Sequence, residues 1–131
     1  MDLEALKKYL NENDTYAKSG RIRLTELREG YAEAILDVNE NSLNALKFVQ
    51  GGAIFTLADM AFAGASNSWG EKAVAMNSTV VFLRPGTGKQ LKAATTLVHK
   101  GRRSCIFDIL ITDECGESVA KITSTGFFFE K

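Results

Sequence analysis

The sequence predicts an α+β protein in which a curved antiparallel sheet of about five or six strands wraps around one long central helix. Residues 51–68 are rich in Ala, Leu, Met and Phe, and a run this long and apolar on all sides is typical of a buried helix. Segments with the alternating pattern of strands lie on both sides of this run. A sheet can cover most of such a helix but not all of it, so the uncovered side favours a second subunit.

The chain before the central helix is expected to form one helix and two strands. Residues 1–13 combine a stripe of Leu side chains with Asp2 in a capping position, which predicts an amphipathic helix. After a loop-like segment, residues 22–27 and 30–38 alternate as two strands, with Gly30 as a turn or bulge between them. Strict alternation places three residues on one face of the first strand: Ile22, Leu24 and Glu26.

Three or four strands follow the central helix, at about residues 73–84, 89–100, 103–113 and 117–129. The turns between them are marked by RPGTGK, KGRR and ECGE. The only proline, Pro85, stands at a strand end, where its missing N–H does least harm. Because the chain shows no repeat, low-complexity tract or linker, residues 1–131 are expected to form a single domain.

Composition excludes several classes of protein. The 131 residues contain 16 Lys and Arg and 16 Asp and Glu, which argues against a nucleic-acid-binding protein with its usual basic excess. No apolar run approaches the roughly 20 residues that span a bilayer, and the N-terminus MDLEALKKYL lacks the apolar region of a secretory signal. Cys105 and Cys115 lack metal-type spacing, so we expect a reduced, cytoplasmic protein without a metal site, with a disulfide between the two as the alternative.

One charge, Asp59, stands inside the apolar run. An unpaired carboxylate removed from water is costly, so Asp59 is either bonded to backbone or a partner chain, or it is a general base or nucleophile. At the start of the run, Gly51 and Gly52 offer backbone N–H groups at a helix N-terminus, which suits an oxyanion. Gln50 and Asn44 add amides that can donate to a carbonyl, although Gln50 can equally be a helix cap and Asn44 can simply fix the loop. Together these are the parts of an acyl-transfer site.

Helix geometry separates these parts. Asp59 follows Gly51 by eight residues, which corresponds to about 12 Å of rise and roughly 80° of rotation on one helix. Groups that act on the same carbonyl must lie about 3 Å from it. The two can therefore share a reaction only if they come from two chains whose helices run antiparallel across a two-fold axis. The sequence predicts an obligate homodimer with two composite sites.

The pattern N-x5-QGG-x6-D over residues 44–59, followed by LAD-x-AFA-x-A-x-NS and FLRP, resembles the hotdog-fold acyl-CoA thioesterases of the phenylacetate-degradation (PaaI-like) type. These belong to the 4-hydroxybenzoyl-CoA thioesterase superfamily. The resemblance covers roughly residues 15–129. It implies a central helix wrapped by an antiparallel sheet, and homodimers that often pair into tetramers. It also implies Asp59 as base or nucleophile and the Gly51 N–H as the oxyanion donor.

This chain departs from the family at one position. The family usually has His before the glycine pair, where this chain has Gln50. Gln can donate a hydrogen bond to a thioester, but it supplies no proton near neutral pH. Gln occupies this place in a related branch that acts on aromatic acyl-CoA substrates. The change leaves hydrolysis as the expected reaction and bears on its rate and on the choice of substrate.

Coenzyme A, as part of the substrate, carries phosphates that need basic partners. The candidates are four basic side chains at strand ends and turns, together with one glycine that has no side chain to block a ligand: Arg84, Lys100, Arg102, Arg103 and Gly52. The alternative for each basic residue is a solvated side chain, which is the default at a turn.

The leading hypothesis is the hydrolysis of small, medium-length or aryl-acyl CoA thioesters to free acid and CoA. It requires no cofactor or metal, and it involves a homodimer or a dimer of dimers without nucleic acid or membrane. The alternative is a non-catalytic module that binds acyl-CoA, which leaves the cost of Asp59 unexplained. A hydratase of the same fold would normally pair a histidine with the carboxylate, and the single histidine, His99, lies in a strand pattern instead.

Overall fold

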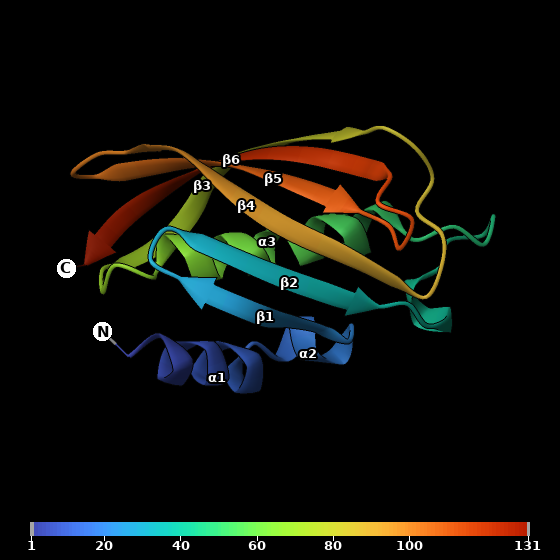
Figure 1. Ribbon diagram of the computed structural model, residues 1–131, viewed down its shortest axis with the longest axis horizontal. Coiled ribbons are helices and arrows are strands. Elements are labelled where there is room, and N and C mark those ends of the chain that lie inside the picture. Colours follow the sequence, from blue (N-terminus) through green and yellow to red (C-terminus); the bar gives the residue numbers. More distant parts are fainter. Residues whose placement is uncertain (1, 131) are drawn as a thin grey trace.

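The computed structural model describes residues 2–130 and shows one curved sheet around one helix (Figure 1). Two N-terminal helices, α1 (Leu3–Asn13) and α2 (Thr15–Ser19), precede the strands β1 (Ile22–Arg28) and β2 (Tyr31–Asp37). A short 3₁₀ helix, η1 (Glu40–Ser42), leads to the central helix α3 (Gly51–Ser66). The strands that follow are β3 (Lys72–Phe82), β4 (Gln90–Lys100), β5 (Ser104–Thr112) and β6 (Ser118–Glu130).

The described residues form a six-stranded antiparallel sheet in the order β1-β2-β4-β5-β6-β3. Figure 1 shows α3 packed against this curved sheet, with α1 and α2 outside β1. The predicted fold class is confirmed, including four strands after the central helix. The helix itself ends at Ser66, slightly before the predicted end at residue 68, because Asn67 caps it.

The core lies between α3 and the sheet. Phe62 of α3 is 2% exposed and meets Phe107 of β5 edge to face, with ring centroids 5.9 Å apart. Gly126 of β6 makes room for this packing, because a Cβ at that position would lie 2.6 Å from the Phe62 ring. Burying one such aromatic side chain stabilises the fold by about 1.5–3 kcal/mol. Cys105 is buried in the same core and Cys115 is exposed; both are free, so the alternative of a disulfide is wrong.

The first strand departs from the predicted alternation. Its register against β2 shifts between Leu24 and Glu26, and such a bulge sets two residues against one on the partner strand. As a result Leu27, and not Glu26, continues the buried face that begins with Ile22 and Leu24. The Glu26 carboxylate stays outside, where it accepts a hydrogen bond from Arg28 at 3.0 Å.

The two edges of the sheet differ in how they are covered. At the β1 edge, the Asn11 side chain of α1 donates to the Leu24 carbonyl at 3.0 Å and accepts from the Leu24 N–H at 2.7 Å. β3 forms the other edge, and large hydrophobic side chains there and just after it are more than half exposed: Val74, Met76, Val81, Phe82 and Leu83. An apolar edge strand is a ready template for pairing with another chain.

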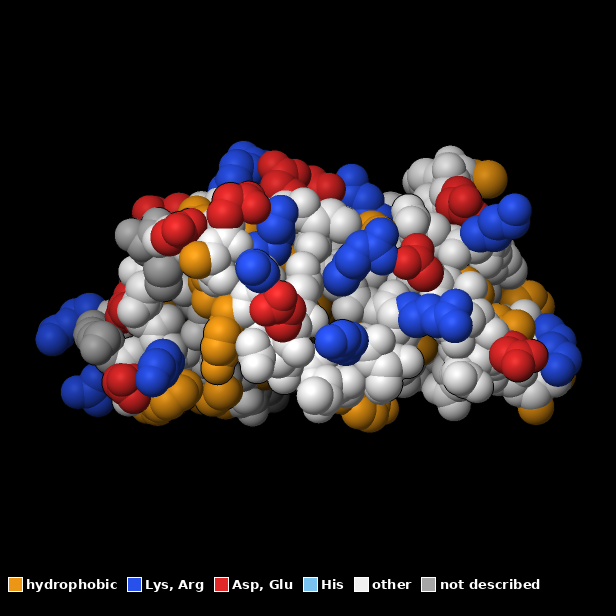
Figure 2. All heavy atoms as spheres, turned by 90° about the horizontal axis from the view of Figure 1, so that it is seen from below, with side chains coloured by type: hydrophobic (Ala, Val, Ile, Leu, Met, Phe, Trp, Pro, Cys, Tyr) orange, Lys and Arg blue, Asp and Glu red, His pale blue; other side chains and the backbone are white. Residues whose placement is uncertain are grey.

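Charges of both signs are interspersed on the surface. Figure 2, seen from the side of α1 and α2, shows Lys and Arg mixed with Asp and Glu over the whole face. This pattern agrees with the formal net charge of zero. Within residues 2–130, no helix has both the length and the apolar character needed to cross a membrane.

Candidate active site

The N-terminus of α3 carries the predicted oxyanion site. Gln50 is the cap of this helix, because its side-chain Oε1 accepts a hydrogen bond from the Gly52 N–H at 2.8 Å. The Gln50 carbonyl accepts from the N–H groups of Ala53 and Ile54. Among the described residues, nothing accepts from the Gly51 N–H. Gly51 is thus the free donor at this end of the helix, with the positive end of the helix dipole behind it.

The prediction that Gln50 caps the helix is confirmed, and the cap uses only half of its side chain. The oxygen is bonded to Gly52, whereas the Nε2 amide makes no hydrogen bond with any residue between 2 and 130. A side chain held in this way has a fixed orientation and a remaining donor. Gln50 can therefore serve both the helix and a ligand.

A cleft of about 380 Å³ opens beside Gly51. The Phe82 ring forms one wall and lies so close that a Cβ at Gly51 would be 3.1 Å from its Cζ atom. Asn44 and Arg84 line the same cleft, and Arg84 is paired with Glu117 at 2.8 Å. This volume lies within the roughly 300–1,000 Å³ that is typical of small-molecule sites. The cleft offers a ligand one backbone donor, one amide and one guanidinium.

Asn44 organises the loop in front of the helix. Its Oδ1 accepts hydrogen bonds from the N–H groups of Leu46 at 2.9 Å and Phe48 at 3.1 Å. This turn brings Lys47 into a left-handed conformation with φ of 70°. The expectation that Asn44 fixes the loop is confirmed, and its Nδ2 amide has no partner within the described chain. Asn44 thus keeps one donor for a ligand or a water molecule.

Asp59 lies on the side of α3 that the sheet leaves open. Its side chain is exposed in the single chain, although its neighbours Ala58 and Met60 are buried. Asp59 makes no hydrogen bond or ion pair with residues 2–130. The pKa of its carboxyl is raised above the ordinary value, mainly because surrounding protein displaces water and secondly because of the negative charge of Asp14. Hydrogen bonds or ion pairs within its own chain therefore do not explain why a carboxylate is placed in this apolar helix.

The structure does not bring Gly51 and Asp59 together within one chain. Both lie on the uninterrupted α3, where their spacing corresponds to about 12 Å of rise. Gly52, Thr56 and Asp59 share one side of the helix, because their spacings are close to whole turns. The Thr56 hydroxyl donates to the Gly52 carbonyl at 2.8 Å. One side of α3 thus presents Gly52 and the Asp59 carboxylate about two turns apart, with the Gly51 N–H rotated away from that side by roughly 80°.

The other predicted phosphate-binding residues lie at the turn between β4 and β5, away from the cleft. Lys100 is engaged within the fold, because its ammonium is 3.1 Å from a Glu71 oxygen and 5.0 Å from the centre of the Trp69 ring. Arg102 and Arg103 line a separate shallow pocket of about 290 Å³ with aromatic side chains of β6. Of the four basic candidates, only Arg84 lines the cleft beside Gly51.

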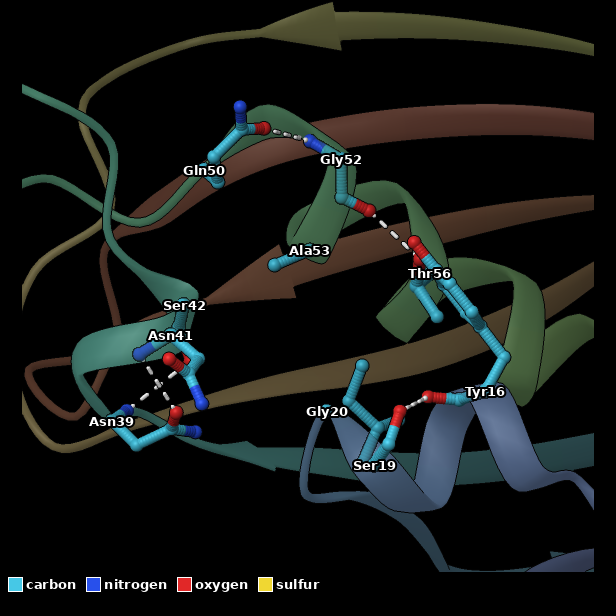
Figure 3. A pocket seen from close by; sticks show the side chains of 11 residues that line it. Tyr16, Ser19, Gly20, Asn39, Asn41, Ser42, Gln50, Gly52, Ala53 and Thr56 are labelled. Carbon is cyan, nitrogen blue, oxygen red and sulfur yellow. Dashed lines mark hydrogen bonds between the residues drawn. The ribbon is translucent and has the colours of Figure 1, made fainter.

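Sequence reasoning missed a second, larger cavity of about 550 Å³ at the α3 N-terminus (Figure 3). One wall is α2, a helix in a segment that the sequence analysis treated as a loop. The sequence did contain a signal for α2, namely an Asp at the N-cap position. The Asp14 carboxylate caps α2 by accepting a hydrogen bond from the Ala17 N–H at 3.1 Å. Tyr16, Asn41 and Thr56 are among the lining residues that reasoning about the motif had not identified.

Comparison with known proteins identifies one family. Residues 46–120 match the model of the thioesterase superfamily. Acyl-coenzyme A thioesterase PaaI of Escherichia coli is 40% identical over 110 residues, which are 83% of this chain and 79% of that protein. The structure of E. coli PaaI has a TM-score of 0.89 at 35% identity, over 93% of this chain and 89% of that chain. A Streptococcus mutans protein bound to acetyl-CoA has a TM-score of 0.79 at 32% identity, over 84% and 90%.

The fold and the matches agree with the resemblance that the N-x5-QGG-x6-D pattern carries. A six-stranded antiparallel sheet around the long helix α3 is the hotdog fold of the PaaI structure. The family match spans the glycine pair and Asp59. The chain therefore belongs to the thioesterase superfamily, as a PaaI-like thioester hydrolase.

Proposed function

We propose that the protein hydrolyses acyl-CoA thioesters to free acid and CoA at a site shared by two subunits. The observation that carries this proposal is the Gly51 N–H, which is free among the described residues and lies beside a cleft. Two relatives indicate the substrate, since one is named an acyl-CoA thioesterase and the other binds acetyl-CoA. The acyl group is proposed to be small, medium-length or aryl.

Two features support a homodimer in which each subunit completes the site of the other. The exposed apolar edge of β3 includes Phe82, whose ring also packs beside Gly51. Antiparallel pairing of two β3 edges across a two-fold axis orients the two α3 helices in opposite directions. Asp59, exposed on the open side of α3, then approaches the glycine end of the other helix. We propose a dimer of such dimers as the full assembly.

In the proposed reaction, the thioester carbonyl oxygen accepts a hydrogen bond from Gly51 of one subunit. The partner's Asp59 takes a proton from water while the water oxygen bonds to the carbonyl carbon. The negative charge that forms on the carbonyl oxygen is stabilised by the Gly51 N–H. The C–S bond then breaks, and its electron pair leaves on the CoA sulfur. The resulting thiolate takes up the proton that Asp59 removed from water. Direct attack by the carboxylate, followed by hydrolysis of the acyl anhydride, is the alternative with the same residues.

Gln50 suits this reaction although it cannot act as an acid. Its oxygen is held by Gly52, so its Nε2 amide is oriented as a second donor for the carbonyl oxygen of the substrate. A thiolate leaving group has a pKa near that of a free thiol, about 8.5. Such a group departs with little protonation, and a histidine at this position is therefore not required.

The proposed function predicts that the purified protein releases free thiol from acyl-CoA esters. The test uses acetyl-, hexanoyl- and phenylacetyl-CoA, with thiol release followed in a chromogenic assay and the free acid identified by chromatography. Rates should be proportional to protein concentration and far above the rate without protein. Tight binding of all three esters, with each recovered intact after long incubation, would support the acyl-CoA-binding module instead.

The raised pKa of Asp59 predicts the acid side of the pH profile. Asp59 acts only as the carboxylate, so kcat/KM should fall as the pH decreases through its pKa. Because Asp14 helps to raise this pKa, Asp14→Asn should move the acid limb to lower pH, and Asn caps a helix as well as Asp does. The measurement is kcat/KM between about pH 4 and 8 at constant ionic strength.

Glu12→Gln is the matched control for this charge removal. It removes an acidic side chain of α1 that is not among the charges raising the pKa of Asp59, so the acid limb should stay in place. An acid limb at the same pH in the parent and in Asp14→Asn would contradict the assignment of this limb to Asp59.

A further inference from the structure

Arg84 is the one charged residue in the lining of the cleft beside Gly51, among the residues that the structure describes. Its backbone is fixed next to β6, because the N–H groups of Leu83 and Arg84 both donate to the Val119 carbonyl, at 2.8 and 3.3 Å. Its guanidinium Nη1 lies 2.8 Å from a carboxylate oxygen of Glu117, which directly precedes the same strand. Both the backbone and the side chain of Arg84 are thus bonded to the start of β6.

The turn between β5 and β6 holds Glu117 in place. The side-chain Oδ1 of Asp113 accepts hydrogen bonds from the N–H groups of Cys115 and Glu117, both at 3.0 Å. The Asp113 N–H donates in return to the Glu117 carbonyl, also at 3.0 Å. The backbone is therefore fixed on both sides of the ion pair. The pairing of Arg84 with Glu117 follows from the fold and not from a chance approach of two mobile side chains.

This ion pair contributes little to the stability of the fold. The Arg84 side chain is 47% exposed and the Glu117 side chain is 60% exposed, and ion pairs in such contact with water are weak because solvent competes for both charges. The main effect of the Glu117 carboxylate is to offset the positive charge at the cleft. The phosphates of CoA together carry more charge than one carboxylate, and a phosphate binds a guanidinium through two oxygens. A phosphate can therefore displace Glu117 from Arg84.

The cleft suits the phosphate-bearing arm of the substrate. A thioester whose oxygen lies at the Gly51 N–H has its reacting end in the cleft that Arg84 also lines. A phosphate that binds Arg84 there must take the guanidinium from Glu117, which is not part of the lining. The binding of CoA thus exchanges one ion pair for another, whereas a thioester without phosphates leaves the pair intact.

We propose that Glu117 competes with the phosphates of CoA for Arg84, and thereby limits how tightly the protein holds both the CoA thioester and the CoA product. The proposal rests on the proposed hydrolysis of acyl-CoA esters. Before binding, Arg84 is paired with Glu117. When CoA is bound, Arg84 pairs with a phosphate and the Glu117 carboxylate is solvated by water. Free CoA dissociates more readily because the carboxylate takes back the guanidinium.

The test uses Glu117→Gln, which removes the charge but keeps the size of the side chain and an oxygen that can accept from Arg84. The substrates are hexanoyl-CoA and S-hexanoyl-N-acetylcysteamine, which carry the same acyl group with and without phosphates. For hexanoyl-CoA, the KM and the inhibition constant of free CoA should fall about three- to fivefold, the effect of one exposed ion pair. The KM of the truncated ester should not change, and high salt should reduce the difference for hexanoyl-CoA.

Two further variants separate the ion pair from general effects of charge. Glu114→Gln is the matched control, because it removes the same charge from the same turn, and Glu114 accepts from the Lys89 N–H and is not paired with Arg84. It should leave both constants at their parental values. Arg84→Gln should raise the KM for hexanoyl-CoA and leave that of the truncated ester unchanged. It should also abolish the effect of Glu117→Gln, so that the double variant behaves like Arg84→Gln alone.

An unchanged or higher KM for hexanoyl-CoA in Glu117→Gln would overturn the inference. An equal fall for the truncated ester, or a fall that persists without Arg84, would overturn it as well. If the parent releases thiol from none of its thioesters, the proposed function itself fails. The dissociation constant of free CoA, measured by calorimetry, then decides the inference alone: severalfold tighter binding to Glu117→Gln than to the parent supports it, and equal or weaker binding contradicts it. Thermal melting shows that each variant is folded.

Discussion

Replacing Asp59 by Asn is expected to lower kcat for acyl-CoA hydrolysis by about 10³-fold or more, because the amide can neither accept a proton from water nor attack the thioester. KM should change little, since in the proposed site the α3 N-terminus and the cleft hold most of the substrate. The measurement is thiol release under saturating substrate with the parent and the variant side by side. A variant that hydrolyses the esters at the parental rate would exclude Asp59 from the reaction.

The same variant is expected to be more stable than the parent at neutral pH. The folded-state pKa of Asp59 is raised, so the protonated form is favoured by folding and the charged form is disfavoured. The stability that this group contributes is fully present below its ordinary pKa and is lost as the pH rises through the raised pKa. The amide side chain of the Asp59→Asn variant does not titrate, so the gain in Tm should appear at pH 7 and shrink in acid. A lower Tm at pH 7 would contradict this assignment.

Replacing Gly51 by Pro is expected to lower kcat by about 10²–10³-fold, which is the usual effect of losing one oxyanion donor. Proline removes the N–H but is favoured at the first position of a helix. Gln50 already has φ of −59° and ψ of 135°, which is the conformation that a residue before proline prefers. The change therefore deletes the donor at little cost to the backbone.

Gly51→Ala is the matched control for this substitution. Its Cβ meets the same Phe82 ring at 3.1 Å, but it keeps the N–H. Loss of activity in Gly51→Pro together with retention in Gly51→Ala would assign the effect to the donor and not to crowding. Equal losses in both variants would argue against the oxyanion role of Gly51.

Mixing the two inactive variants tests whether the site is composite. Dimers that contain one Asp59→Asn chain and one Gly51→Pro chain have one site with both defects and one site with neither. After denaturation and refolding together, random pairing should restore about one quarter of the parental activity per subunit. Each variant refolded alone is the control. No recovery, with mixed dimers verified by mass, would show that each chain uses its own Gly51 and Asp59.

Local patterns in the sequence were sufficient to predict the elements on which the proposed site is built. The apolar run of α3 has no strand-like alternation, and the spacing of Gly51 and Asp59 along one helix is fixed by helix geometry. The bulge in β1 was not predictable in this way, because it moves Leu27 inward in place of Glu26 through pairing with another strand. The cavity was missed because its lining combines residues of separate elements, among them Tyr16, Asn41 and Thr56.

By itself, the sequence determined the fold class, the glycine pair at a helix start and a carboxylate that this start cannot reach. Only the tertiary structure decided which backbone donor is free, because the Gln50 side chain folds back to cap Gly52 and leaves Gly51. It also decided which edge of the sheet is open, because Asn11 bonds to β1 at Leu24 while β3 keeps its apolar side chains exposed. These outcomes depend on side-chain orientation and on contacts between distant residues, which residue periodicity does not encode.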